Sequence, residues 1–270
     1  SDCFDNPSRV LLSPCDVCEY LNHLIRCFVS VVDLLKNTVG EDLELKDECQ
    51  INRGGPAQTT NQDPDSGPDQ NVVAIVLAAG RSLRMGGTNK LLAKLDGKSI
   101  LHHVVTALQG SQIENVVVVL GHEAEKIKLD LEGEDVTYVM NPDYEQGIGT
   151  SISAGIRSVD KSARGALIML GDMPVISAKT IDKLVHHFNR NPQAEIVVPT
   201  YENQPGNPVL WSSRFFPQLS SLTGDRGGKP LIETNTDVVS FCSVDSESVH
   251  IDVDNSHELE RLRATVGLGS

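Results

Sequence analysis

The stretch that decides the fold is residues 71–92, which read NVVAIVLAAGRSLRMGGTNKLL. It opens with the apolar run Val72–Leu77, which is rich in β-branched residues, and such a composition is typical of a strand buried on both faces of a parallel sheet. Small residues follow the run, and then come two arginines and a single lysine. Ligands of open parallel sheets bind beyond the carboxyl ends of the strands, so this segment is a first candidate for a binding site.

Apolar runs and helical patterns alternate along the rest of the chain. The predicted strands are 72–77, 115–120, 136–140, 166–170 and 196–199, and the predicted helices are 99–109, 123–131, 150–158 and 177–189. This β-α-β-α order predicts an α/β domain of three layers, with a mostly parallel sheet between two layers of helices.

The first 70 residues differ in character from the rest. Within residues 1–48, a Ser-Pro helix start precedes apolar residues at helical spacing, which predicts a helical segment. Residues 49–70 are rich in Gly, Pro, Asn, Gln and Asp and predict a flexible linker, so the main domain is expected over residues 71–270. Five of the six cysteines fall in the first 49 residues, but one Cys-x-x-C without a second favours reduced structural thiols over a bound metal.

Net charge and hydropathy exclude several classes of partner. The formal charge of -14 argues against a broad nucleic-acid or membrane-surface interface, because either partner would be repelled. The chain has no uninterrupted apolar stretch of about 18 residues and lacks the basic start and apolar core of a signal peptide. We therefore expect a cytoplasmic protein with no membrane and no nucleic-acid partner.

The segment after the first strand has the composition of a phosphate-binding loop. Ala78, Ala79 and Gly80 are small enough to let backbone N–H groups approach an anion, and Arg84 and Lys90 can neutralise phosphate charge. The spacing matches neither the P-loop nor the G-x-G-x-x-G dinucleotide pattern. The alternative is an ordinary strand-to-helix turn with solvated cations.

A carboxylate follows a second predicted strand. Asp172 comes directly after the run Ala166–Leu170 and Gly171, where it could bind a Mg²⁺ ion carried by substrate phosphates. A lone Asp after a strand is more often a helix cap, although Ser177 competes for that role before the next helix. Read with the loop at residues 77–92, Asp172 becomes the stronger candidate for a metal ligand.

Several segments in this order resemble the signatures of the molybdenum cofactor nucleotidyltransferases, a MobA-like branch of the nucleoside-triphosphate transferase superfamily with a Rossmann-like fold. The matching segments are LAAGRSLRMGGTNKLL (77–92), NPDYEQGIGTSISAG (141–155), GDMP (171–174), GNPVL (206–210), GDRGGK (224–229) and IDVDNSHEL (251–259). The resemblance covers about residues 72 to 264, and no part of residues 1–70 contributes to it.

The resemblance implies a role for each matching position. The catalytic residues would be Arg84, Lys90 and Asp172. The nucleotide would be bound by Leu77, Ala78, Ala79, Gly80, Arg84, Met85, Gly86, Lys90, Gly147 and Ser151. Asn207, Pro208 and Asp225 would face the acceptor, and Mg²⁺ would be held by Asp172 and Asp252, with Asp254 the next ligand in order of preference. Turn chemistry is an equally good explanation for Asp225, because Thr-Gly-Asp-Arg-Gly-Gly is rich in turn residues.

The function implied is Mg²⁺-dependent transfer of CMP from CTP to the terminal phosphate of the molybdenum cofactor, molybdopterin. Ala79 favours CTP, since the LAAG form accompanies CTP in this family and a LAGG form accompanies GTP. A client molybdoenzyme is a further expected partner. The alternatives are a GTP-using or other nucleotidyltransferase of the same type, a non-catalytic cofactor chaperone, and a reductase on the same fold.

Overall fold

The computed structural model of the protein describes residues 71–81 and 89–266. The predictions for residues 1–48 and 49–70 fall outside the described residues, as do those for Arg84, Met85 and Gly86. All structural statements below concern the described residues.

One mixed sheet forms the centre of the domain, with the strand order β10-β7-β9-β6-β1-β4-β5. Its strands are β1 (Val72–Ala78), β4 (Asn115–Leu120), β5 (Thr137–Met140), β6 (Gly165–Leu170), β7 (Ile196–Tyr201), β9 (Val209–Ser212) and β10 (Val239–Ser243). β1 pairs in parallel with β4 on one side and with β6 on the other, and only β9 and the short β8 (Gln204–Pro205) pair antiparallel with their neighbours. The prediction of a mostly parallel sheet is therefore confirmed.

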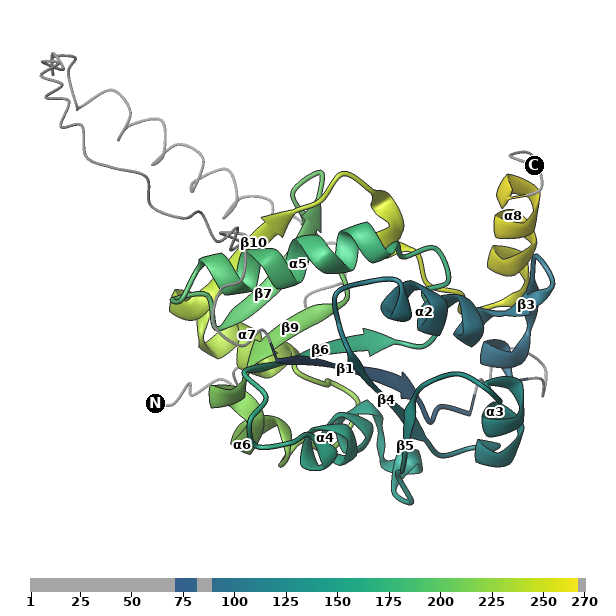
Figure 1. The fold of residues 1–270 in the computed structure, drawn as a ribbon, viewed down its shortest axis with the longest axis horizontal. Coiled ribbons are helices and arrows are strands. Elements are labelled where there is room, and N and C mark those ends of the chain that lie inside the picture. Colours follow the sequence, from purple (N-terminus) through teal and green to yellow (C-terminus); the bar gives the residue numbers. More distant parts are fainter. Residues whose placement is uncertain (1–70, 82–88, 267–270) are drawn as a thin grey trace, which may run out of the picture. The chain divides into compact units, whose positions relative to one another are not determined.

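Helices cover both faces of the sheet, with α2 and α5 on one face and α4 and α6 on the other (Figure 1). The helices are α2 (Ile100–Gln109), α3 (Ala124–Asp130), α4 (Ile148–Ser158), α5 (Ala178–Arg190), α6 (Phe216–Leu219), α7 (Lys229–Thr234) and α8 (Ser256–Val266). Short 3-10 helices are η2 (Lys90–Leu92), η3 (Tyr144–Gln146), η4 (Ser213–Phe215), η5 (Thr236–Val238) and η6 (Glu247–His250).

Two hydrophobic cores follow from the alternation of side chains along the central strand. Val72, Ala74 and Val76 of β1 pack with helices α2, α3 and α5, while Val73 and Ile75 pack with α4 and α6. A strand with both faces buried must be apolar throughout, which explains why β1 shows no polar alternation in its sequence.

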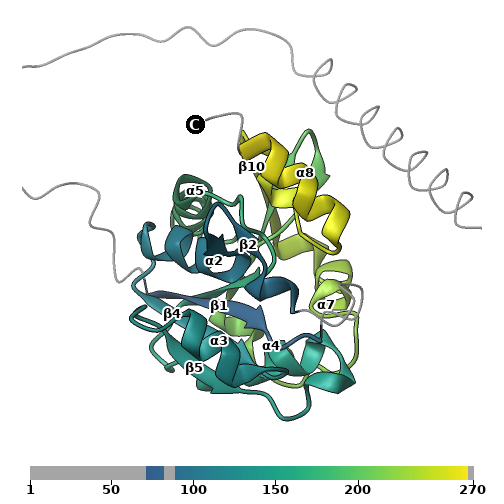
Figure 2. The same ribbon diagram turned by 90° about the vertical axis from the view of Figure 1, so that its right-hand side faces the viewer.

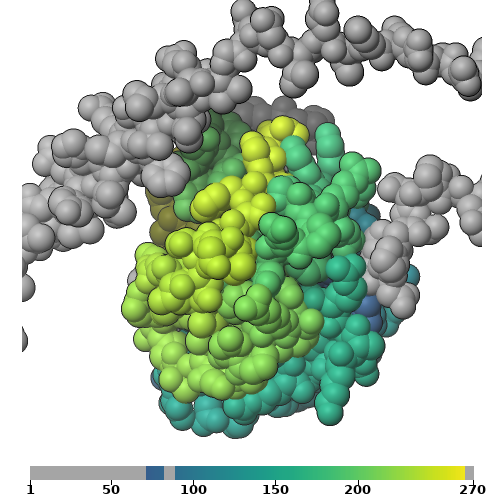
Figure 3. Space-filling view, turned by 90° about the vertical axis from the view of Figure 1, so that its left-hand side faces the viewer, coloured from purple at the N-terminus to yellow at the C-terminus, as the bar shows by residue number. Residues whose placement is uncertain are grey.

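The C-terminal helix α8 lies apart from both layers, beside the small hairpin of β2 (Lys94–Leu95) and β3 (Lys98–Ser99), as Figure 2 shows. A third apolar cluster, centred on Leu95, Ile100, Val253 and Leu259, joins α8 to this hairpin. The face of the domain that carries the edge strand β10 consists mainly of the C-terminal third of the chain (Figure 3).

The predicted elements agree with the observed ones to within about two residues at each end. Ser177 caps α5 by accepting a hydrogen bond from the backbone N–H of Thr180 at 3.1 Å, so Asp172 is not the cap of that helix. Strands β9 and β10 were not predicted. Among the described residues no helix combines the length and the apolar character needed to cross a bilayer.

Candidate active site

Three carboxylates meet at the carboxyl edge of the sheet. Asp172 follows β6 through Gly171, and Asp252 and Asp254 come from the segment between η6 and α8. One carboxylate oxygen from each residue takes part, and these three oxygens all lie within 4.8 Å of one another. Asp172 is buried. Asp172 lies at this edge because it follows the carboxyl end of a strand. Asp252 and Asp254 lie there because the chain returns to the same edge between η6 and α8.

Hydrogen bonds hold the two acidic segments together. The backbone N–H of Val253 donates to the carbonyl of Asp172 at 2.9 Å, and Val253 itself is fully buried. The N–H of Asp254 donates to the carboxylate of Glu258, in the first turn of α8, at 2.7 Å. The positions of Asp252 and Asp254 are therefore fixed on both sides of a buried valine.

Lys90 supplies the positive charge of this cluster. Its Nζ lies 2.5 Å from Oδ2 of Asp172 and 2.8 Å from Oδ1 of Asp254. The preceding residue Asn89 accepts a hydrogen bond from Leu91 N–H at 3.1 Å and so starts the 3-10 turn that presents Lys90. Burial alone would lower the pKa of Lys90, but the charges and hydrogen bonds of Asp172 and Asp254 outweigh it and raise the pKa.

The donor set fits a hard divalent cation such as Mg²⁺ or Mn²⁺, because carboxylate oxygens are the ligands these ions prefer. Oδ1 of Asp172 is buried and has no hydrogen-bond partner among the described residues, although a buried carboxylate oxygen normally has one. Partial burial, and next the charges of Asp172 and Asp254, raise the pKa of Asp252. A bound cation would relieve both conditions, so the three carboxylates can hold a metal ion.

A pocket of about 700 Å³ adjoins this cluster. Of the residues predicted to bind nucleotide, those that line it are Leu77, Ala79, Gly80, Lys90, Gly147 and Ser151. Asp172, Asp254 and Asp225 line it as well. The side chain of Ala78 is fully buried in the core and does not line the pocket.

The amino end of α4 forms one wall of this pocket. Gly147 has a φ of 107°, and a Cβ there would lie 2.4 Å from the carbonyl carbon of Gly224 and 2.5 Å from Oδ1 of Asp225. Only glycine satisfies both conditions, which explains the residue at this position. Asn141 donates hydrogen bonds to the hydroxyls of Thr150 at 2.9 Å and Ser151 at 3.0 Å, and these bonds fix the first turn of the helix.

Sequence reasoning missed an ion pair at the rim of the same pocket. Arg81 and Glu145 both line it, and Nη1 of Arg81 lies 2.9 Å from Oε1 of Glu145. Both side chains are about half exposed, so the pair can open without a large cost. The position of Arg81 directly after Gly80 was a signal for this residue, whereas nothing in the sequence pointed to Glu145.

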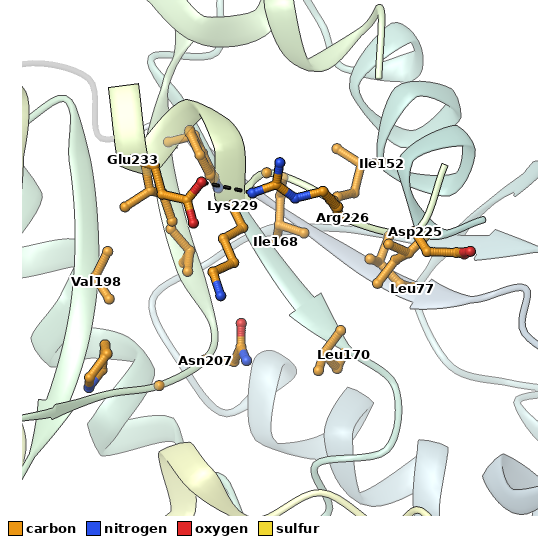
Figure 4. A pocket seen from close by; sticks show the side chains of 18 of the residues that line it. Leu77, Ile152, Ile168, Leu170, Val198, Asn207, Asp225, Arg226, Lys229 and Glu233 are labelled. Carbon is orange, nitrogen blue, oxygen red and sulfur yellow. Dashed lines mark hydrogen bonds and ion pairs between the residues drawn. The ribbon is translucent and has the colours of Figure 1, made fainter. Parts of the chain in front are cut away.

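A second pocket, of about 490 Å³, adjoins the first and shares Leu77, Ile148, Leu170 and Asp225 with it. We call the first the nucleotide pocket and the second the acceptor pocket, because residues predicted to bind the nucleotide line the first and residues predicted to face the acceptor line the second. Asn207 lines the acceptor pocket, but Pro208 is buried and does not. Figure 4 shows the acceptor pocket, whose walls are mostly aliphatic and aromatic.

Residues 74–239, more than half of the chain, match the sequence profile of the MobA-like NTP transferase domain. The chain belongs to this family. The crystal structure of a Rv0371c homolog from Mycobacterium sp. strain JC1 is similar with a TM-score of 0.64 and 32% identity, over 74% of this chain and 99% of that one. Rv0371c of Mycobacterium tuberculosis in complex with manganese gives a TM-score of 0.61 and 26% identity, over 72% of this chain and 99% of that one.

Among curated proteins, the bifunctional protein GlmU of Brevibacillus brevis is 33% identical over 128 residues. The match covers 46% of this chain and 27% of GlmU, so the chain spans about a quarter of the length of that relative. As a MobA-like NTP transferase, the chain has the fold and family of nucleotidyltransferases. Its acidic cluster lies beside the pocket that is lined by most of the described residues predicted to bind the nucleotide.

Proposed function

We propose that this protein transfers CMP from CTP to the terminal phosphate of the molybdenum cofactor, molybdopterin, in an Mg²⁺-dependent reaction that releases pyrophosphate. The observation that carries the proposal is the contact between Lys90 and Asp172 at the edge of the nucleotide pocket, next to an apolar acceptor pocket that shares four residues with it. A cation and a carboxylate that can bind a metal, in a pocket that adjoins a second pocket, suit the transfer of a group from one bound molecule to another.

In the proposed complex the nucleotide lies against Leu77, Ala79, Gly80, Gly147 and Ser151, all of which line the nucleotide pocket. Backbone N–H groups of the loop after β1 bind the phosphates, and Ala78, the last residue of β1, leads into this loop. Arg84, Met85 and Gly86 lie outside the described residues, and the resemblance to the family implies that they also bind the nucleotide.

The reaction needs alignment and charge more than proton transfer. A phosphate oxygen of the acceptor attacks the α-phosphorus of CTP, and the bond from that phosphorus to the oxygen shared with the β-phosphate breaks. The acceptor phosphate is already an anion near pH 7, so no general base is required. Lys90 turns from the carboxylates to the phosphate oxygens and stabilises the charge that develops on pyrophosphate.

Asp172, Asp252 and Asp254 would hold the Mg²⁺ ion. The ion would supply charge neutralisation at the phosphate oxygens. Asn207 and Asp225, which line the acceptor pocket, would face the phosphate-bearing acceptor.

Ala79 carries the choice of CTP over GTP. It is almost fully buried and lines the nucleotide pocket, so a change of one methyl group there alters the space beside the bound nucleotide. A GTP-dependent reaction at the same site is the nearest alternative, and turnover with GTP but not with CTP would replace our assignment.

A cofactor chaperone without transferase activity is less well supported, since a chaperone has no need of the Lys90–Asp172 contact or of a metal-binding cluster. A reductase would need a nicotinamide site, and spectral titration with a nicotinamide nucleotide would reveal one. Delivery of the product to a client molybdoenzyme would follow the transfer as a later step.

Pyrophosphate release with each of the four nucleoside triphosphates, with and without molybdenum cofactor, tests the proposal. Mass spectrometry of the product should show the cofactor plus CMP. Asp172→Ala and Lys90→Ala should each lose most of the activity with unchanged circular dichroism, whereas Asp245→Ala, at a carboxylate that is 81% exposed, should keep it. A fully active Asp172→Ala protein would remove the basis for the metal site.

A further inference from the structure

The acceptor pocket has an uneven distribution of charge. Of its two cations, Arg226 is paired with Glu233 at 2.8 Å, and both side chains of that pair are about half exposed or more. The side-chain ammonium of Lys229 has no hydrogen bond or ion pair within the described part of the chain, and Figure 4 shows the side chain extending into the pocket toward Asn207. The side-chain amide of Asn207 likewise has no hydrogen-bond partner among these residues. Its backbone N–H donates to the carbonyl of Val249 at 2.9 Å.

The loop before α7 fixes the position of Lys229. Gly228 lies flat against Trp211, since a Cβ on Gly228 would come within 2.6 Å of Cζ2 of the indole. Trp211 is fully buried, and Ile232 of α7 packs in the same apolar cluster as Trp211. Lys229 therefore begins α7 at a point anchored to the core, and its charge projects from a fixed base.

The surroundings of Lys229 and Asn207 are apolar. The pocket walls include Ile152, Ile168, Val198, Val209, Trp211 and Phe241. In such surroundings an acceptor with many hydroxyl groups would lose hydration without finding enough hydrogen-bond partners, whereas a charge-assisted hydrogen bond to an ammonium is strengthened. The chemistry of these walls suits a flat or weakly polar body more than a polyol.

Lys229 and the reacting groups line different pockets. Lys90, Asp172 and Asp254 line only the nucleotide pocket, and Lys229 and Asn207 line only the acceptor pocket. If the reacting phosphate of the acceptor lies at Lys90 and Asp172, a different part of the acceptor lies at Lys229 and Asn207.

We infer that Lys229, together with Asn207, binds a second anionic group of the acceptor, separate from the phosphate that reacts. Lys229 is then a specificity-determining residue that selects acceptors with a weakly polar body and two anionic ends over sugar phosphates. This inference rests on the proposed function for the identity of the reaction, but not for the presence of the anion site.

Two arms test it. In the first, 1-anilinonaphthalene-8-sulfonate, which has an apolar body and one anionic group, is titrated by fluorescence into the wild type, Lys229→Met and the matched control Arg226→Met, with 1-anilinonaphthalene as the uncharged probe. We expect Lys229→Met to weaken sulfonate binding about tenfold, equivalent to about 1.4 kcal/mol, with the uncharged probe unaffected and Lys229→Arg restoring affinity. Equal affinity in the two methionine variants would overturn the inference.

In the second arm, steady-state kinetics with CTP and molybdenum cofactor should show a KM for the cofactor about tenfold higher in Lys229→Met, with kcat and the KM for CTP unchanged, because the contact is the same in the ground and transition states. N-acetylglucosamine 1-phosphate should be a poor acceptor for every variant. If the cofactor is not a substrate but the sulfonate arm succeeds, the proposed acceptor is wrong and the anion site stands. If the cofactor reacts with an unchanged KM in Lys229→Met, the transfer reaction stands and the inference fails.

Discussion

Replacing Lys90 by methionine should destabilise the metal-free protein and should make its stability depend on added metal. Methionine keeps the unbranched apolar stem and removes the ammonium that bridges Asp172 and Asp254. Two charge-assisted hydrogen bonds are lost, each worth about 1.5–3 kcal/mol. The repulsion among the carboxylates, about 3.5 kcal/mol for two full charges at the greatest separation of 4.8 Å and an effective dielectric constant of about 20, is present in both proteins but is no longer offset by the ammonium in the variant.

Solvent and protonation reduce this cost. Asp254 has 40% of its side chain exposed, and the raised pKa of Asp252 lets that group take up a proton more readily than an ordinary carboxylate. We therefore expect a net loss of about 2–4 kcal/mol in the free energy of unfolding, less than or close to the cost of breaking a fully buried pair. For a domain of this size the melting temperature should fall by about 5–12 °C.

Thermal unfolding in chelator and in a series of Mg²⁺ concentrations measures the effect. The control is Lys94→Met, four residues further on, which breaks an ion pair to Asp130 of 2.8 Å from a lysine that is 57% exposed and should cost about 1 kcal/mol or less. Mg²⁺ should raise the melting temperature of Lys90→Met by more than that of the wild type, because the lysine no longer competes for the carboxylates. If Lys90→Met were no less stable than Lys94→Met in chelator, the cluster would not depend on Lys90 for its charge balance and our reasoning would be refuted.

Three further predictions concern stability. Gly155→Ala should cost about 1–3 kcal/mol in urea unfolding, since its Cβ would lie 2.5 Å from Cγ2 of the buried Ile75; an unchanged midpoint would contradict this packing. Burial lowers the pKa of His187, so the folded protein holds this proton less tightly than the unfolded chain, and the free energy of unfolding should fall as the pH drops below 6.5; His187→Asn should flatten that part of the pH profile. Asp252→Asn should raise the melting temperature in chelator, because its carboxylate is ionised at a cost in the folded state at neutral pH, and should reduce the shift on adding Mg²⁺; a lower melting temperature in chelator would show that the carboxylate stabilises the cluster.

The sequence predicts the central part of this fold well, for a physical reason. Strands buried on both faces are long apolar runs, so β1, β4 and β6 are easily recognised in the sequence. The carboxyl ends of parallel strands meet at one edge of the sheet, so the loop after β1 and Asp172 are predicted to lie together, although Lys90 and Asp172 are 82 residues apart in the chain. β10 was missed because it is an edge strand with only Cys242 buried, and its residues show no apolar run.

The ligand set shows where sequence reasoning stops. Asp252 and Asp254 are two residues apart on either side of a buried valine, and no pattern in the chain tells which of them turns toward Asp172. Resemblance favoured Asp252, whereas both acids lie within reach of Asp172 and it is Asp254 that contacts Lys90. Lys229 had no assigned role in its motif for a similar reason, since its direction depends on how Gly228 packs against Trp211.

Helix α8 explains how an acidic cluster that repels itself can be held in one place. Its Glu258 accepts the backbone N–H of Asp254 at 2.7 Å, and its Arg263 donates two hydrogen bonds, at 2.6 and 3.1 Å, to the carbonyl of Lys94, just beyond the turn that carries Lys90. Leu259 and Leu95 pack in the same apolar cluster. The helix thus ties the segment of the C-terminal carboxylates to the segment of the lysine, and the apolar contacts and backbone hydrogen bonds on this side of the domain offset the repulsion that a metal site requires.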